Sequence, residues 1–350
     1  MEAHHDAVAD LTTLGWRPEL AAALPAGTAP ARVVRVDRGR LGVLTAEGER
    51  RVHPGSGLRS GDLPVSPAVG DWVALRDELA VAVLPRRSAF TRTAAGRTSV
   101  GQVVAANLDL VLVVDALAGL ARPRRVERYL AVAWSSGATP VVVLTKADLC
   151  DDVGAAVAAA ADDALGVDVL AVSAVTGEGL EAVRALLGPG RTAAMVGPSG
   201  VGKSSLANAL AGRELAATRE IRADGRGRHT TTARELHLLP GGGLLVDTPG
   251  MRELALHDDE EGIRAAYADV AVLAEECRFR DCAHRTEPGC AVAAALDDGR
   301  LDPARFTAWR KLQAEAHRQR LRVDARARAE EHARVRALQR SRNSRPGRPR

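Results

Sequence analysis

One segment, Gly197-Pro198-Ser199-Gly200-Val201-Gly202-Lys203-Ser204, constrains the fold more than any other part of the chain. It fits the P-loop pattern G-x-x-x-x-G-K-[ST], with an apolar run at 192–196 before it and a helical run at 204–211 after it, as this pattern requires. Glycines let the backbone wrap closely around phosphates, which the loop N–H groups and the helix N-terminus then face. The segment predicts a nucleoside triphosphate site, although a glycine-rich turn without a ligand would have a similar sequence.

Several residues of this loop have an expected role. The residues from Gly197 to Ser205 would surround the phosphates, and Pro198 would contribute no N–H donor. Lys203 would bridge the β- and γ-phosphates, and the Ser204 hydroxyl would bind Mg²⁺. The sequence therefore predicts Mg²⁺ as a cofactor that arrives with the nucleotide.

Two later segments fit the switch regions of such a site. Asp247-Thr248-Pro249-Gly250 has the D-x-x-G arrangement, in which Asp247 would hold Mg²⁺ through water and the Gly250 N–H would contact the γ-phosphate. The segment Gly227-Arg228-His229-Thr230-Thr231-Thr232 lies between this motif and the P-loop, and Thr231 is the threonine that we expect to complete the Mg²⁺ shell. Each segment alone could be an ordinary loop.

A further segment predicts that the base is guanine. Thr145-Lys146-Ala147-Asp148 ends an apolar run and matches the pattern [NT]-K-x-D. The Asp148 carboxylate can accept hydrogen bonds from guanine N1–H and the N2 amino group, whereas adenine presents the opposite pattern. The Lys146 stem would lie along the base. Ser173-Ala174 follows another apolar run and would offer a backbone N–H to guanine O6.

The order of these segments along the chain is unusual. The guanine elements at 145–148 and 173–174 precede the P-loop at 197–204, and the switch segments at 227–232 and 247–250 come last. In an ordinary GTPase the P-loop comes first and the guanine elements last. The rotated order predicts a circularly permuted G domain, which keeps the same sheet and joins the original termini.

Three of the four cysteines lie close together in the C-terminal part of the chain. The pattern Cys277-x4-Cys282-x-His284-x5-Cys290 offers three thiolates and one imidazole, a set that forms closed tetrahedral zinc sites. One zinc ion per chain would stabilise a region that is too small for a core of its own. The alternative is three buried thiols beside a surface histidine.

The spacing of apolar runs divides the 350-residue chain into domains. Five short β-like runs between residues 32 and 84 predict a small OB-like barrel, which either binds nucleic acid or only packs against its neighbour. From residue 107 onward, strand-length runs alternate with helical runs, which predicts a parallel sheet with helices on both faces. We therefore expect a multi-domain α/β protein with a lead at 1–28, an OB-like β-barrel at 29–90, a circularly permuted P-loop G domain at 91–257, a zinc-binding helical domain at 258–317 and an arginine-rich tail at 318–350.

The tail makes the charge distribution asymmetric. Residues 318–350 contain 12 arginines and 3 acidic residues, so this part carries a charge of +9. Because the net charge of the whole chain is +4, the preceding residues carry about −5. Such an arm commonly contacts nucleic acid, although it can also be a solvated helix face. A helix is expected to begin with Asp302 as N-cap and Pro303 in its first turn, and to run past Arg310 into the arm.

Composition and the N-terminal sequence exclude several classes of protein. Apolar residues make up 46% of the chain, which allows a sizeable core and excludes collagen and wholly disordered chains. The apolar runs are far shorter than the ~20 residues that span a bilayer, and the acidic N-terminus has no apparent signal peptide. Clustered cysteines favour metal binding in a reducing compartment. We therefore expect a cytoplasmic protein without a membrane partner.

Together these segments resemble the ribosome small subunit-dependent GTPase A (RsgA) family of circularly permuted GTPases. The motifs that carry the resemblance, besides the Cys/His cluster, are TKAD at 145–148, GPSGVGKSS at 197–205, GRHTTT at 227–232, DTPG at 247–250, PAVGDW at 67–72 and QVVAANLDLVLVV at 102–114. The resemblance implies GTP hydrolysis that the small ribosomal subunit stimulates and a role in late maturation of that subunit. The chain departs from the family in Thr145, which replaces the usual asparagine, and in its long tail.

The resulting expectation is a monomeric GTP hydrolase that docks on the small ribosomal subunit and its rRNA. Lys203 would neutralise charge on the phosphates while water attacks the γ-phosphorus. Met251 stands where Ras-like enzymes have a water-orienting glutamine, so His229 is the candidate for this role, unless it contacts RNA or solvent. Two alternatives are an RNA-binding assembly chaperone that uses nucleotide as a structural ligand or slow switch, and a permuted GTPase of the large subunit.

Overall fold

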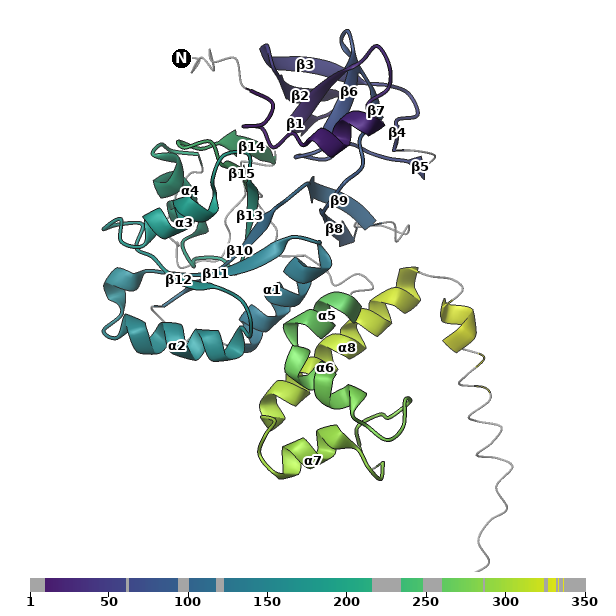
Figure 1. The fold of residues 1–350 in the computed structure, drawn as a ribbon, viewed down its shortest axis with the longest axis vertical. Helices are drawn as coiled ribbons and strands as arrows, with labels where there is room; N and C mark the ends of the chain where they lie inside the picture. The colour runs from purple at the N-terminus through teal and green to yellow at the C-terminus, as the bar shows by residue number, and fades with distance from the viewer. Residues whose placement is uncertain are drawn as a thin grey trace, which may run out of the picture.

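The computed structural model describes residues 10–60, 63–93, 101–117, 123–215, 234–247, 260–285 and 287–323, with 327–331, 333 and 336. Three parts are visible: a barrel at one end of the molecule, an α/β domain in the middle, and a group of C-terminal helices beside the α/β domain (Figure 1). This arrangement confirms the expected fold class of an OB-like barrel, a P-loop α/β domain and a helical domain with the Cys/His cluster.

The barrel has five strands: β1 (Ala29–Asp37), β2 (Arg40–Thr45), β3 (Gly48–Pro54), β6 (Trp72–Arg76) and β7 (Leu79–Val83). They close in the order β1-β2-β3-β7-β6-β1, in which only the β3–β7 pair is parallel. Alternate residues such as Val33, Val43 and Val73 fill the interior. Three short elements lie outside these strands: the 3-10 helix η1 (Pro18–Ala23), β4 (Arg59–Ser60) and β5 (Leu63–Pro64).

The sheet of the α/β domain is mostly parallel. Its strands are β10 (Leu110–Ala116), β11 (Thr139–Thr145), β12 (Val169–Ala171), β13 (Thr192–Val196), β14 (Glu235–Leu238) and β15 (Leu244–Asp247). They lie in the order β12-β11-β10-β13-β15-β14, and β14 is antiparallel to its neighbour β15. The sequence predicted a parallel sheet, and β14 is the antiparallel strand that this prediction did not include. The short connection from β14 to β15 permits only a hairpin, because a parallel pair needs a crossover of about a dozen residues or more.

Helices cover both faces of this sheet. They are α1 (Pro123–Ser135), α2 (Val153–Asp163), α3 (Leu180–Leu186) and α4 (Lys203–Ala211), with the 3-10 turn η2 (Ala147–Leu149). Successive strand residues belong to different cores: Leu112 and Val143 pack with α3 and α4, whereas Val113 and Val142 pack on the side of α1. Strands that are buried on both faces have near-continuous apolar sequences, which made them predictable.

The barrel and the α/β domain share one continuous sheet, a feature that we did not predict. Strand β1 pairs with β14 at Arg35 and Glu235, whose side chains form an ion pair of 3.3 Å. A two-stranded sheet of β8 (Ala89–Thr93) and β9 (Gly101–Ala106) lies between the two domains in sequence. The barrel is therefore joined to the strand that follows the predicted switch I segment.

A buried arginine also links the barrel to the α/β domain. Arg32 is 1% exposed, and its guanidinium donates to the carbonyl oxygens of Leu14 and Asn107 (3.3 and 3.2 Å) and to Thr192 Oγ1 (3.1 Å). The guanidinium carbon lies 5.3 Å from the centroid of the Trp72 ring. Burial lowers the pKa of Arg32 to about 10. One side chain thus connects the lead, the barrel and the strand that precedes the P-loop.

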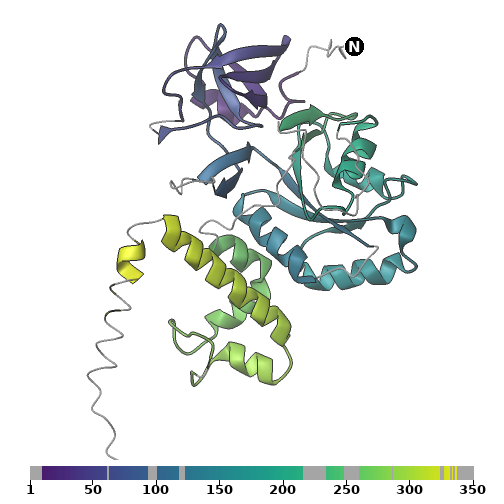
Figure 2. The ribbon, with the colours of Figure 1, turned by 180° about the vertical axis from the view of Figure 1, so that it is seen from behind.

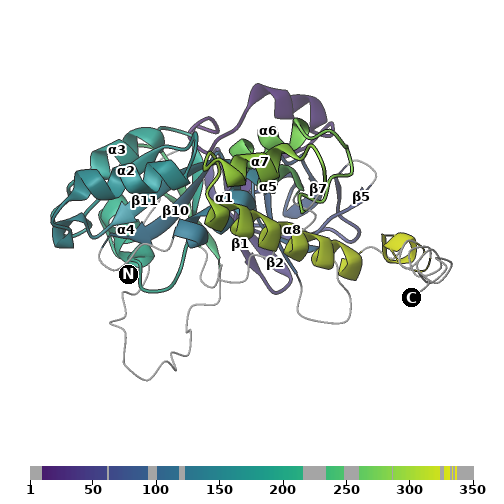
Figure 3. The ribbon, with the colours of Figure 1, turned by 90° about the horizontal axis from the view of Figure 1, so that it is seen from below.

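Between residues 260 and 323, the described part of the C-terminal region contains the helices α5 (Glu260–Ala266), α6 (Ala268–Glu275), α7 (Ala291–Asp297) and α8 (Pro303–Val323). As predicted, Asp302 caps α8, since its carboxylate oxygens accept from the N–H groups of Ala304 and Arg305 (2.9 and 3.2 Å). Helix α8 continues past Arg310 and lies alongside α5 (Figures 2 and 3). Among the described residues, no helix is both long and apolar enough to cross a membrane.

Candidate functional site

The P-loop connects β13 to α4. Three of its glycines, Gly197, Gly200 and Gly202, have positive φ values of 142°, 79° and 96°, which glycine adopts without steric cost. At Gly197 a Cβ would lie 2.1 Å from the carbonyl oxygen of Val114 on β10. Only glycine therefore allows the loop to leave the sheet at this point.

The side chain of Lys203 folds back over this loop. Its Nζ donates to the carbonyl oxygens of Gly197 and Pro198 at 2.8 and 2.5 Å. Helix α4 begins at the same residue, and the first N–H groups of a helix lack partners within it. A positive charge and the N–H groups at the start of a helix thus meet at one loop, which is the arrangement that an anion-binding site requires.

The guanine segment lies at the end of β11, directly beside the P-loop. Lys146 has a φ of 62°, and its Nζ donates to the carbonyl oxygen of Gly200 at 3.1 Å. The buried Thr145 hydroxyl donates to the carbonyl oxygen of Val201. A Cβ on Gly202 would lie 3.3 Å from this same hydroxyl. Threonine therefore reaches the P-loop at the position where related motifs have asparagine.

Ser173 has a role that we did not predict, because it holds the Asp148 carboxylate. Its hydroxyl is buried and donates to Asp148 Oδ1 at 2.5 Å. Ser173 Oγ in turn accepts from the N–H groups of Val175 and Thr176 at 3.2 and 3.1 Å. The hydroxyl is thus fixed by the backbone, while Asp148 itself is exposed. A serine that follows a short apolar strand was the signal for this contact.

The sheet brings the predicted nucleotide-binding segments to one edge. Strand β13 lies between β10 and β15, and β11 lies on the far side of β10. All four strands are parallel, so the residues at their carboxyl ends meet, including Asp247 at the end of β15. The remaining predicted site residues, His229, Thr231 and Gly250, lie outside the described residues, as do the whole segments 216–233 and 248–259.

The Cys/His cluster forms a second candidate site. Cys277 follows α6, Cys282 and His284 lie in the next loop, and Cys290 is the N-cap of α7. Nδ1 of His284 lies 3.5 and 3.6 Å from the sulfurs of Cys277 and Cys290, which are 3.8 Å apart, and all four ligand atoms are within 4.8 Å of one another. Ligands about 2.0–2.3 Å from a tetrahedral ion lie ~3.3–3.8 Å apart, so the cluster could hold a metal ion.

The surroundings of the cluster influence its protonation. Burial lowers the pKa of His284 and favours the neutral imidazole, which is the form that binds metals. Burial raises the pKa of the Cys277 thiol, but hydrogen bonds from N–H groups at the start of α7 and from the neighbouring thiols outweigh it and lower the pKa overall. Burial and the neighbouring sulfurs raise the pKa of Cys282 to about 11. Metal binding would therefore release protons from the cluster.

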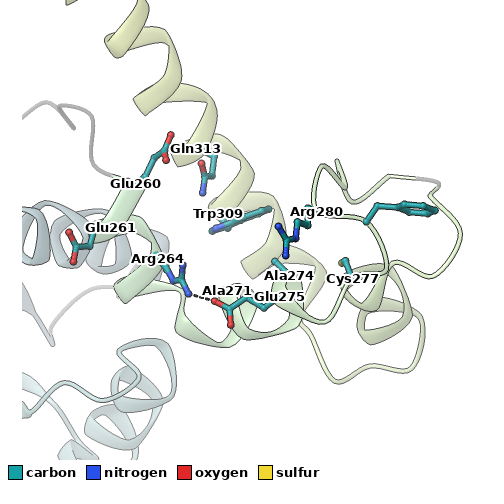
Figure 4. A pocket seen from close by; sticks show the side chains of 11 residues that line it. Glu260, Glu261, Arg264, Ala271, Ala274, Glu275, Cys277, Arg280, Trp309 and Gln313 are labelled. Atoms are coloured by element: carbon teal, nitrogen blue, oxygen red, sulfur yellow. Dashed lines mark hydrogen bonds and ion pairs between the residues drawn. The ribbon is translucent and has the colours of Figure 1, made fainter. Parts of the chain in front are cut away.

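An open cleft of about 900 Å³ lies beside the cluster, among residues of α5, α6 and α8. Trp309 lines it from α8, and Arg264 and Glu275 form an ion pair on another wall (Figure 4). The Trp309 ring centroid also lies 5.6 Å from that of His284. Because the indole touches a metal-ligand candidate, its fluorescence can report on changes in the cluster.

Buried charged residues at the domain contacts were not predicted as functional. Glu127 on α1 and Arg305 on α8 form an ion pair of 2.8 Å that joins the α/β domain to the helical domain. The signal in the sequence is a charged residue at the edge of an apolar run, as with Glu127 in the segment 126–134, VERYLAVAW. This signal is weak because a helix that is half exposed has the same pattern.

Comparison with known proteins gives consistent matches. A model of the RsgA GTPase family matches residues 83–257. The chain is 47% identical over 332 residues to the small ribosomal subunit biogenesis GTPase RsgA of Streptomyces coelicolor, a match that covers 91% of this chain and 90% of its relative.

Two solved structures have a similar fold. The crystal structure of YjeQ from Thermotoga maritima matches with a TM-score of 0.62 and 27% identity, and covers 83% of this chain and 98% of that chain. The structure of YloQ, a circularly permuted GTPase, matches with a TM-score of 0.58 and 21% identity, and covers 83% of this chain and 96% of that chain. The rotated order of motifs is therefore that of a known fold.

Proposed function

Because the chain belongs to the RsgA GTPase family and is a GTP-hydrolysing enzyme, we propose that it acts on the small ribosomal subunit and contributes to late assembly of that subunit. The relatives that it matches are named small ribosomal subunit biogenesis GTPases. The observation that carries the nucleotide assignment is the contact between the guanine segment and the P-loop, through Thr145 to Val201 and Lys146 to Gly200. This contact supports one site for base and phosphates.

In this proposal the chain's residues bind and orient GTP. Asp148, which Ser173 holds, accepts hydrogen bonds from guanine N1–H and the amino group. Lys203 exchanges the loop carbonyls for the β- and γ-phosphates. Mg²⁺, when bound, neutralises charge that develops on the transferring phosphoryl group. The residues proposed to hold it are Ser204, Thr231 and Asp247.

His229 is the residue proposed to orient the attacking water, because Met251 cannot do so by hydrogen bonding. A neutral imidazole can accept a hydrogen bond from water. We expect His229→Ala to lower the kcat of subunit-stimulated GTP turnover by about 10²-fold or more, while the affinities for nucleotide and subunit stay at the wild-type level. Phosphate release at saturating GTP and saturating subunits measures this change.

The exposed His317 on α8 provides a matched control. His317→Ala should turn over GTP at the wild-type rate. If His229→Ala keeps the wild-type turnover, or if its turnover falls only as much as its affinity for the subunit, then a ribosomal group orients the water. The role proposed for His229 would then be wrong.

We further propose that the metal in the Cys/His cluster is zinc, one ion per chain. Three thiolates and one imidazole form a ligand set that suits Zn²⁺. We expect Cys282→Ala to release the ion and to loosen the segment 277–290, which elemental analysis and Trp309 emission would record. GTP affinity should persist, since the nucleotide site has its own core.

The half-buried Cys150 lies outside the cluster and allows a control. Cys150→Ala should keep a full equivalent of zinc. Carefully purified wild-type protein without metal, or an unchanged zinc content in Cys282→Ala, would refute the ligand assignment.

Ribosomal RNA is the proposed contact of the barrel, the helical domain and the arginine-rich arm at 318–350, and a cytoplasmic monomer is the proposed form. Met251, in place of a water-orienting glutamine, favours a second candidate, an RNA-binding assembly chaperone in which GTP is a slow switch. The number of phosphates released per chain separates the two. The hydrolase completes many turnovers when small subunits are present, whereas the chaperone releases about one phosphate per bound chain or fewer.

A further inference from the structure

The barrel contacts the sheet of the α/β domain in line with Asp247. Strand β1 lies beside β14 and pairs with it at Arg35 and Glu235 (Figure 1). On its other side β14 pairs with β15, where Glu235 is the partner of Asp247. Arg35, Glu235 and Asp247 therefore form one row across three neighbouring strands, and each backbone pair of this row lies in the described part of the chain.

This row lies at the edge of the sheet that carries the nucleotide site. Asp247 is the last residue of β15, which is parallel to β13. Because β14 is antiparallel to β15, its first residue, Glu235, lies at this same edge. Glu235 also shares a face of β14 with His237, whose partner Leu245 belongs to the same core as Leu206 of α4. Glu235 is thus placed on the side of the sheet where the P-loop leads into α4.

An ion pair between the barrel and β14 neutralises Glu235. Arg35 Nη1 donates to Glu235 Oε1 at 3.3 Å, and Arg35 Nε donates to Asp37 Oδ2, on its own strand, at 2.9 Å. The side chains of Arg35 and Glu235 are 32% and 40% exposed. Ion pairs this accessible to water contribute little to stability, so we expect this pair to matter mainly through the charge that it cancels.

The charge on Glu235 acts on the position proposed for Mg²⁺. Adjacent strands lie about 4.8 Å apart, well within the ~8 Å over which charges interact at physiological ionic strength. Acidic residues directly opposite each other on adjacent strands repel, and a cation bound at the end of β15 relieves this repulsion. The same negative charge opposes the phosphates of the nucleotide. Because its guanidinium pairs with Glu235, Arg35 reduces both effects.

We infer, on the basis of the proposed Mg²⁺ role of Asp247, that Glu235 and Arg35 together set the Mg²⁺ affinity of the nucleotide site. Glu235 raises this affinity by its charge, and Arg35 lowers it by neutralising Glu235. Arg35 acts only through Glu235. The barrel thereby has an electrostatic connection to the metal position, which runs through strand pairs and does not depend on the switch segments.

Substitutions of the two residues should shift the Mg²⁺ affinity in opposite directions. With a fluorescent, non-hydrolysable GTP analogue bound, we expect Glu235→Gln to weaken Mg²⁺ binding about two- to fivefold, the size of effect that one exposed charge exerts. Arg35→Gln should strengthen Mg²⁺ binding by a similar factor. Titration with MgCl₂ at low ionic strength measures both shifts, which should shrink in about 1 M salt because charges are then screened beyond ~3 Å.

The affinity for the analogue in EDTA is a second, metal-free measurement. Glu235→Gln should raise this affinity and Arg35→Gln should lower it, because without Mg²⁺ the charge on Glu235 only repels the phosphates. The double variant Arg35→Gln/Glu235→Gln should match Glu235→Gln alone in both measurements, since no charge is left at residue 235 for Arg35 to cancel.

Glu49→Gln and Arg51→Gln are matched controls, because they remove the same charges from exposed positions on β3 of the barrel. Both should keep the wild-type Mg²⁺ affinity. Shifts of the same sign in Glu235→Gln and Arg35→Gln, or no shift in either, would overturn the inference while Asp247→Asn still loses Mg²⁺ affinity. An Asp247→Asn variant that binds Mg²⁺ as tightly as the wild type would instead overturn the proposed role of Asp247, and the inference with it.

Discussion

Replacing Lys203 with alanine is expected to lower GTP turnover by about 10³-fold or more and to weaken GTP binding more than GDP binding. The ammonium group contacts the P-loop carbonyls of Gly197 and Pro198, from where it can pair with the β- and γ-phosphates. Without it, loop N–H groups and Mg²⁺ alone oppose the charge of the transition state. Phosphate release measures turnover, and competition with a fluorescent nucleotide measures affinity.

The other lysines make this experiment specific. The chain contains only three, Lys146, Lys203 and Lys311, and Lys311 is exposed on α8. Lys311→Ala should therefore behave as the wild type. Near-wild-type turnover in Lys203→Ala would contradict the phosphate-site assignment.

Asp148→Asn should change the base that the enzyme accepts. The carboxylate can only accept hydrogen bonds, whereas an amide can also donate to the additional carbonyl of xanthine. Sites that read a base by hydrogen bonds reject a mismatched one by about 10⁴-fold, so we expect GTP affinity to fall by a factor of this order and xanthosine triphosphate to become the better ligand. Direct titration with both nucleotides measures the exchange.

Asp151→Asn makes the same chemical change three residues further along the chain, at an exposed position, and should keep the preference for GTP. If Asp148→Asn also keeps it, as measured by the ratio of GTP to ATP affinity, Asp148 does not read the base. The Ser173 hydroxyl can donate to an amide oxygen as well as to a carboxylate oxygen. In Asp148→Asn it should therefore hold the new side chain at residue 148 in the same position.

The segments of the candidate nucleotide site could be recognised in the sequence because each of them is local. A P-loop needs its glycines at particular positions, as the clash of a Cβ at Gly197 with the Val114 carbonyl shows. The strands around it are buried on both faces, so their apolar runs are continuous. The cluster at 277–290 was predictable for a similar reason, since ligand spacing is a property of the local sequence.

Contacts between distant segments were not predictable. Arg32 has the sequence context of an outward-facing barrel residue, yet it is buried because the lead and the strand before the P-loop cover it. Gly262 is one of 33 glycines, and only the nearby backbone of α1 shows why it cannot be replaced.

The most direct test of the account is the rate of phosphate release at saturating GTP with purified small subunits, with large subunits and with neither. We predict multiple turnover that small subunits raise at least about tenfold, below the ~10³–10⁵-fold of activators that supply a catalytic arginine, and that large subunits leave unchanged. Equal rates under all three conditions, or a rate that only large subunits raise, would contradict it.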